Sequence, residues 1–226
     1  MNQKTKSYFF KQKLWGLLTY QPRWGLTIKG WLLSILTILT GALIIVLNIH
    51  PFLAPVAPIE ADALVIEGWI GDDGIKGAIA EFQQRDYRIL VTVGTPLSRG
   101  DYLSEYDNFA QLSAATAIKL GFNPQKIATV PSPLVQRNRT LASAIAVKQW
   151  LQKNYPQIKA VNVYSDSVHS RRSWLLYKRA LEPDFKVGII AHDATDYEAK
   201  LWWTYSEGFR DVIGEAIAYI YAKFLS

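Results

Sequence analysis

The clearest pattern in the chain is an uninterrupted apolar run near its N-terminus. The twenty residues from Gly30 to Ile49 contain no ionisable side chain. At about 1.5 Å of rise per residue, a helix of this length crosses a hydrocarbon core of about 30 Å with its backbone polar groups bonded internally. The pattern therefore predicts a transmembrane helix over residues 30–50.

Two alternatives to a membrane anchor are open. A cleaved secretory signal has an apolar core of only about 7–15 residues and a small residue at its cleavage site. Here the run is longer and continues into a Pro-rich stretch, Pro51 to Pro58, which is a poor context for cleavage. An apolar helix buried in a soluble protein is the second alternative. We favour the uncleaved anchor and interpret residues 51–58 as a stiff, extended linker.

Residues 59–226 form one domain in which two kinds of pattern alternate. Short runs rich in Val and Ile predict strands at Ala63 to Ile66, Arg88 to Val93, Ile127 to Val130, Ala160 to Ser165 and Lys186 to Ala191. Helical spacing occupies Gly74 to Arg85, Tyr102 to Leu120, Thr140 to Lys153 and Ser170 to Leu181. This alternation predicts an α/β domain with a Rossmann-like, doubly wound, mostly parallel five-stranded sheet.

The last segment, Thr195 to Leu225, predicts one long helix, with a possible break near Gly208. Its apolar residues recur mostly at three- and four-residue steps, which is usual for a helix packed on a core. It also holds more aromatic residues than one buried face requires, among them Trp202, Trp203 and Tyr221. The alternative is that part of this helix contacts the bilayer or the anchor.

The distribution of charge predicts the topology of the chain. Residues 1–29 hold six basic residues and no acidic one, which places this segment in the cytoplasm and the domain outside. Without those six, 19 of the 25 basic residues remain, matching the 19 acidic residues. The basic excess thus belongs to the anchor and indicates contact with membrane lipid, while nucleic acid is not expected as a partner.

Cysteine usage and histidine spacing limit the chemistry further. The chain has no cysteine, which suits a bacterial extracytoplasmic domain and excludes thiolate metal sites. The three histidines show no ligand spacing, so we expect no metal. The G-x-G-x-x-G fingerprint is missing after the first strand, and we predict no cofactor. The predicted location is the bacterial plasma (inner) membrane, with a single pass.

Ligands of open parallel sheets bind at the carboxyl ends of the strands, so the loops there hold the candidate site. After the fourth strand, His169 stands at a predicted helix start with Arg172 three residues on, on the same face. Imidazole can exchange a proton near neutral pH, and guanidinium can hold a phosphate or carboxylate. The alternative interpretation is a hydrogen-bonded polar histidine beside solvated arginines.

Two further loops add candidates. Arg137 and Arg139 precede Thr140, which we expect to cap the next helix, so positive charge again meets a helix N-terminus. Glu67 ends the first strand and is a candidate base or a group that orients His169. A charged surface turn and a solvated strand-end carboxylate are the respective alternatives.

The order of these pieces resembles the YdcF-like family, whose membrane-anchored branch includes SanA- and ElyC-type envelope proteins. The resemblance runs from about Ala61 to the C-terminus and is carried by Ala63-Leu64-Val65-Ile66, by Ile89-Leu90-Val91-Thr92-Val93 ending at Gly94, and by Ser104-Glu105, Gly121-Phe122, Thr140, and His169 with Arg172. It implies a role in cell-envelope biogenesis, with site residues at Gly94, Glu105, Thr140, His169 and Arg172.

The chain departs from the family pattern at two places. Thr95-Pro96 follows Gly94 where the family carries a Ser-Gly-Gly type turn. Arg139-Thr140 and Ala142-Ser143 stand in place of Asn-Thr and Glu-Asn. These departures indicate an altered pocket, and the family's fold carries over more readily than any activity.

Our preferred hypothesis is a domain that binds or processes an anionic, phosphorylated envelope intermediate such as a lipid-linked glycan. His169, Glu67 and Glu105 would be the catalytic candidates, and Arg172, Arg139, Arg137, Thr140 and Gly94 would bind the anion. The competing hypothesis is a non-catalytic scaffold that holds another membrane protein through Trp202 and Trp203. A third, a nucleotide- or S-adenosylmethionine-binding domain, conflicts with the outward topology.

Overall fold

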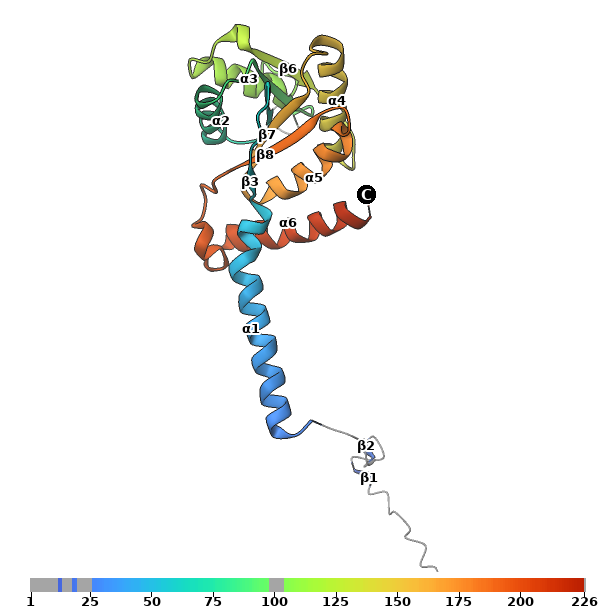
Figure 1. The fold of residues 1–226 in the computed structure, drawn as a ribbon. Helices are drawn as coiled ribbons and strands as arrows, with labels where there is room; N and C mark the ends of the chain where they lie inside the picture. Colours follow the sequence, from blue (N-terminus) through green and yellow to red (C-terminus); the bar gives the residue numbers. More distant parts are fainter. Residues whose placement is uncertain (1–11, 14–17, 20–25, 98–103, 226) are drawn as a thin grey trace, which may run out of the picture. The chain divides into compact units, whose positions relative to one another are not determined.

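A computed structural model describes residues 12–13, 18–19, 26–97 and 104–225 of the chain (Figure 1). It divides into two units, Met1–Ile44 and Ile45–Ser226. In the first unit, strands β1 (Gln12–Lys13) and β2 (Leu18–Thr19) pair antiparallel. Lys4, Lys6, Lys11 and Arg23 of the predicted cytoplasmic segment lie outside the described residues.

The predicted apolar helix is present as α1 (Ile28–Leu53), which begins two residues earlier and ends three residues later than expected. Thr27 Oγ1 accepts a hydrogen bond from the Gly30 amide at 3.2 Å and so satisfies one free amide of the first turn. The helix is long and apolar enough to cross a membrane, and its most apolar window is not buried within the protein. Pro51 lies in its last turn.

The expected linker over residues 51–58 is wrong. Pro51 to Leu53 continue α1, and Val56–Ala57 form strand β3, which pairs antiparallel with a strand of the domain's sheet. The Asn162 side chain then holds the next residue, Ile59, by hydrogen bonds to its amide at 3.0 Å and its carbonyl at 2.8 Å. The Pro-rich segment is therefore part of the folded domain, because its backbone groups are bonded to the sheet.

The sheet has six strands in the order β3-β8-β7-β4-β5-β6, one more than predicted. All five predicted strands are confirmed as β4 (Ala63–Glu67), β5 (Ile89–Gly94), β6 (Ile127–Pro131), β7 (Ala160–Asp166) and β8 (Lys186–His192). These five run parallel, and β3 makes the sheet mixed. Val and Ile fill the central strands because side chains on both faces are buried.

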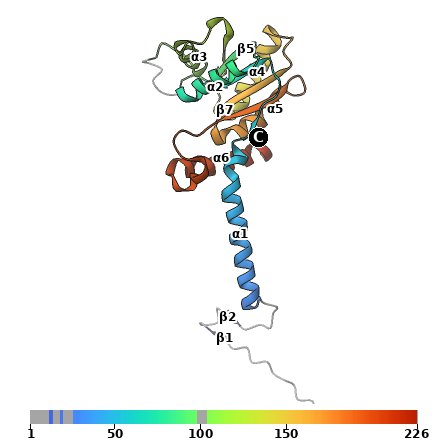
Figure 2. The same ribbon diagram turned by 60° about the vertical axis from the view of Figure 1, so that its left-hand side comes forward.

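Helices cover both faces of the sheet (Figure 2). On one face, α4 (Arg139–Asn154) and α5 (Ser170–Leu181) close a core that includes Val147, Leu151 and Tyr177. On the other, α2 (Asp72–Gln84) and α3 (Phe109–Lys119) pack Ile75, Phe82 and other side chains against Leu64 and Ile66. Short 3-10 turns, η2 (Pro124–Lys126) and η3 (Ser167–His169), complete the connections.

Helix α3 starts at Phe109, because Asn108 Oδ1 accepts the Gln111 amide at 2.9 Å and caps the helix there; the predicted start at Tyr102 lies outside the described residues. The long helix expected from Thr195 to Leu225 is also wrong. It consists of a 3-10 segment, η4 (Ala199–Thr204), and α6 (Ser206–Phe224), with Tyr205 extended between them. A third buried cluster joins these elements to the end of α1 and contains Leu53, Val168, Tyr197, Trp202 and Val212.

Candidate functional site

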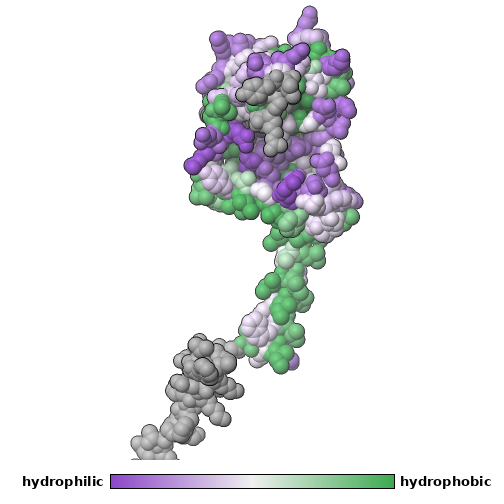
Figure 3. Space-filling model, turned by 180° about the vertical axis from the view of Figure 1, so that it is seen from behind, coloured by the Kyte–Doolittle hydropathy of each residue, from purple (hydrophilic) through white to green (hydrophobic). Residues whose placement is uncertain are grey.

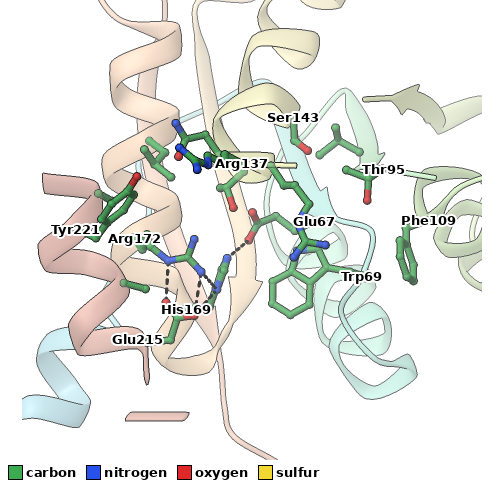
Figure 4. A pocket seen from close by; sticks show the side chains of 18 of the residues that line it. Glu67, Trp69, Thr95, Phe109, Arg137, Ser143, His169, Arg172, Glu215 and Tyr221 are labelled. Atoms are coloured by element: carbon green, nitrogen blue, oxygen red, sulfur yellow. Dashed lines mark hydrogen bonds and ion pairs between the residues drawn. The ribbon is translucent and has the colours of Figure 1, made fainter. Parts of the chain in front are cut away.

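A cavity of about 680 Å³ opens at the carboxyl ends of the parallel strands (Figure 4). This volume is in the range of small-molecule sites. Seven of the eight predicted site residues line it: Glu67, Gly94, Arg137, Arg139, Thr140, His169 and Arg172. The wall also includes Trp69, Phe109, Glu215 and Tyr221, so charged and aromatic side chains face the same space.

Glu67 lies at the end of β4 with only 2% of its surface exposed. Its Oε2 atom accepts hydrogen bonds from the hydroxyls of Ser165, at the end of β7, and Ser173, in α5 at 2.8 Å. A buried carboxylate needs such donors because it has lost its hydration. The two serines fix the position of this carboxylate in the cavity wall.

His169 stands where β7 turns into α5. The turn passes through Ser167, whose φ of 32° is in the left-handed region, and delivers His169 to the N-cap position of α5. The ring packs edge-on against Trp69, with centroids 4.7 Å apart. Its Nε2 atom is 3.9 Å from Glu67 Oε2 and has no hydrogen-bond partner among the described residues. Nε2 is itself buried in this structure, so a ligand atom or water can bond to it only after a neighbouring side chain such as Trp69 moves.

The other side of His169 contacts an ion pair. Glu215 of α6 accepts two hydrogen bonds from Arg172, at 2.9 Å each, and lies 3.0 Å from His169 Nδ1. Arg172 Nη2 is also 2.9 Å from Nδ1. Nδ1 can donate to Glu215 or accept from Arg172, and the ionised carboxylate is the stronger partner. We infer that Nδ1 carries the proton, which leaves Nε2 as the atom that exchanges protons with a ligand.

The protonation states agree with this network. Burial raises the pKa of Glu215, but hydrogen bonds from His169 and Arg172 outweigh it and lower the pKa to about 2. Burial likewise opposes the charge of Arg172, and its hydrogen bond to Glu215 raises its pKa above the usual value. Both groups are therefore charged at neutral pH. We predicted that Arg172 would hold an anion directly. In the structure its charge is paired with that of Glu215 instead.

Arg137 and Arg139 remain as uncompensated cations. Both are exposed at the cavity, and neither forms a salt bridge within residues 26–97 and 104–225. Arg139 and Thr140 are the first two residues of α4, so Thr140 is not the cap that we expected. Asn138 occupies the cap position with φ 55°, and its side chain makes no capping hydrogen bond to the first helical amides. These amides and the two guanidinium groups together favour a bound anion.

Gly94 has a steric role. A Cβ atom there would lie 2.6 Å from Phe109 Cβ and 2.8 Å from the Ala110 amide nitrogen. The missing side chain lets the start of α3 approach the end of β5, where the Phe109 amide bonds to Thr95 O at 3.0 Å. Gly94 thereby shapes the floor of the cavity through packing, which differs from the anion contact that we predicted.

The G94A variant is expected to lose about 1–3 kcal/mol of stability, because backbone atoms of α3 must move to admit the methyl group. The free energy of unfolding, from denaturant titration in detergent, checks this. G71A is the control within the same unit, since no described atom lies within 4 Å of a Cβ at that position and its φ of −65° suits alanine. Equal stability of G94A and G71A would contradict the close approach.

Glu105, the eighth predicted residue, is exposed and does not line the cavity. Conversely, sequence reasoning missed Glu215, Ser165 and Ser173. The sequence does indicate a role for Glu215. It is the sole charged residue between Val212 and Ala222 in an apolar helix, and a charged residue in such a place requires a partner. The described residues contain no group of three or more His, Cys, Asp or Glu side chains that could hold a metal ion.

No family model matches this chain, and no curated protein matches it. The resemblance to the YdcF-like family stays a prediction from the residues quoted above.

Proposed function

We propose that this protein is anchored in the bacterial plasma membrane and binds or processes a phosphorylated, lipid-linked glycan intermediate of the cell envelope. The observation that supports this proposal best is the convergence of three features on one cavity: two arginines without a salt bridge among the described residues, a helix N-terminus whose cap residue makes no side-chain hydrogen bond, and an oriented histidine. An anion is the ligand that such a set of groups stabilises. α1 would keep the cavity near membrane-bound substrates and so raise their effective concentration.

In this proposal Arg137, Arg139 and the first amides of α4 hold the phosphate. Each guanidinium can donate two parallel hydrogen bonds to phosphate oxygens. Their exposure at the cavity lets them adapt to the ligand. Trp69, Phe109 and Tyr221 supply flat apolar surfaces for a sugar ring or the first units of a lipid chain.

His169 acts as the general acid or base in the processing version of the proposal. Glu215 holds Nδ1 and orients the ring, as a carboxylate does in other histidine sites, while Arg172 keeps Glu215 ionised. Glu67, 3.9 Å from Nε2, orients the attacking water or ligand hydroxyl. Glu105 takes no part, because it is exposed outside the cavity.

We further infer a Rossmann-like, doubly wound arrangement and membership in the YdcF-like family. The parallel strands follow the spatial order β6-β5-β4-β7-β8, so the chain begins in the middle of the parallel set and works outward to each side. The predicted topology puts the basic N-terminal segment in the cytoplasm and the domain outside. The net positive charge of the chain, which residues 1–29 account for, supports it.

Phosphate binding tests the proposal. Titration of the detergent-solubilised full chain with a short-chain polyprenyl phosphate should give saturable heat, and R137A and R139A should each raise Kd about tenfold through loss of a charge-assisted hydrogen bond. R88A is the control, because the exposed Arg88 pairs with Asp62 at the amino ends of the strands, opposite the cavity. Binding that is absent, or unaffected by R137A and R139A, would refute the proposal.

The competing scaffold hypothesis requires Trp202 and Trp203 to form an exposed surface that binds another membrane protein. Trp202 is 3% exposed and donates a hydrogen bond to Val46 O at 3.1 Å, so it belongs to the core, and only Trp203 is accessible. Copurification of a membrane protein that depends on Trp203, together with no phosphate binding, would favour the scaffold.

A further inference from the structure

The two sides of helix α6 differ in what they contact. One side carries Val212 and Ala222 into the interior and places Glu215 at the cavity, which Tyr221 also lines from the border between the two sides. The other side carries large apolar residues at steps of three and four, each between 39% and 71% exposed: Phe209, Ile213, Ile217, Ile220 and Phe224. We name this set the α6 apolar face. A continuous apolar face of this kind on a domain surface marks an interaction site.

The α6 apolar face belongs to a helix that contacts the end of the membrane-spanning candidate α1. The rings of Phe52 and Tyr219 meet at 5.5 Å, and Val46 and Ile49 pack on the cluster that contains Val212. Ile45 and Leu47, in the same turns of α1, are 62% and 53% exposed. Hydrophobic surface gathers along this edge of the domain in Figure 3. The exposed apolar surface of α6 therefore continues that of the last turns of α1.

The composition around the α6 apolar face suits a lipid surface. From Ala216 to Phe224 the sole charged residue is Lys223, whose Nζ lies 5.4 Å from the centre of the Phe224 ring. Trp203 and Tyr205, just before α6, are 36% and 39% exposed, and amphipathic aromatic rings of this kind favour the headgroup layer. A lysine that extends from an apolar face can reach anionic headgroups.

We propose that α6 lies in the interfacial layer of the membrane, with the α6 apolar face toward the acyl chains. This inference rests on the proposed anchoring of α1 in the same membrane. A docked α6 would bring the cavity, whose wall contains Glu215 and Tyr221 of the same helix, to the lipid surface. The cavity would then receive the head of an amphiphile directly from the bilayer.

Site-directed spin labelling of the full chain in vesicles of phosphatidylethanolamine and phosphatidylglycerol tests this surface. The chain has no cysteine, so each label needs only one substitution. Labels on I217C and I220C should collide several-fold more with dissolved oxygen, relative to an aqueous nickel chelate, than a label on I145C. Ile145, in α4, is 42% exposed and serves as the water-facing control. Circular dichroism checks that each variant is folded.

A label on I38C, within α1, separates failure of this inference from failure of the anchor. Lipid contact at I38C with water contact at I217C would overturn the docking of α6 alone. Water contact at both would overturn the anchoring proposal as well. Protection of I217C from both collision agents would mean that protein covers the face, a second copy or another chain, and would also overturn the lipid assignment. Phosphate binding is measured separately and does not affect these outcomes.

Discussion

Replacing Glu215 with glutamine is expected to destabilise the domain by about 3–5 kcal/mol at neutral pH. Arg172 is largely buried, and its Nε and Nη2 atoms both donate to this carboxylate at 2.9 Å. E215Q leaves the guanidinium charged and without its counterion, and replaces the ionised acceptor of His169 Nδ1 by a neutral amide oxygen. The free energy of unfolding in denaturant measures the loss.

The effect of E215Q should also depend on pH. The pKa of Glu215 is lowered from 4.5 to about 2 in the folded protein, so its ionised form stabilises the fold above the unfolded value. A shift of this size corresponds to about 3 kcal/mol. The difference between wild type and E215Q should be complete at pH 7, begin to shrink below about pH 4.5, and vanish as the pH falls through about 2.

Two further variants serve as controls for E215Q. E207Q removes an exposed carboxylate of the same helix, whose partner is the adjacent Ser206, and should change stability by less than about 0.5 kcal/mol. The double variant R172M/E215L removes both charges together and should recover most of the stability lost in E215Q. Equal stability of E215Q and E207Q would show that the ion pair does not hold α6 to α5.

The N162A variant should lose about 3–5 kcal/mol, because one side chain serves three buried or half-buried groups. Asn162, in the middle of β7, is fully buried. Its side-chain oxygen, Oδ1, accepts a hydrogen bond from the backbone amide of Ile59 at 3.0 Å. Its side-chain nitrogen, Nδ2, donates to the Ile59 carbonyl at 2.8 Å and to the Tyr87 hydroxyl at 2.7 Å. Alanine leaves both groups of Ile59 without this partner and removes one of two hydrogen bonds of the Tyr87 hydroxyl, which still donates to Glu81 at 3.1 Å. Denaturant titration measures the cost.

N154A is the matched control for N162A. Asn154 bonds to a carbonyl of its own helix, Trp150 O, at an exposed site, so water can replace the lost hydrogen bond. Its change in stability should stay within about 0.5 kcal/mol. A comparably small loss in N162A would mean that Ile59 is not held to the sheet by this side chain.

Local patterns were sufficient to predict the parallel strands. Each of the five begins and ends within one residue of the expected position, because Val- and Ile-rich runs with buried faces are bounded by polar or Gly and Pro residues. Strand β3 escaped prediction because it has two residues between prolines and exists only through its pairing with β8. Its signal is therefore not local.

In the candidate site, too, some residues could be predicted from local patterns and others could not. His169, Glu67 and Arg139 could be found because strand ends and helix starts fix them along the chain. The role of Arg172 could not, since it depends on Glu215, which is 43 residues away in the sequence. The break, which we expected near Gly208, lies three residues earlier at Tyr205, because the apolar spacing continues through it and does not mark its position. Side-chain pairing between distant elements is the information that periodicity lacks.

The direct joining of α1 to β3 has a practical consequence for preparing a soluble fragment. Truncation before residue 59, where hydropathy suggests a boundary, would delete β3 and leave the outer edge of β8 open to intermolecular pairing. It would also remove Leu53 from its buried cluster and the carbonyl of Val46 that receives the Trp202 indole. A fragment that avoids aggregation must therefore retain the last two turns of the apolar helix, even though these are poorly soluble.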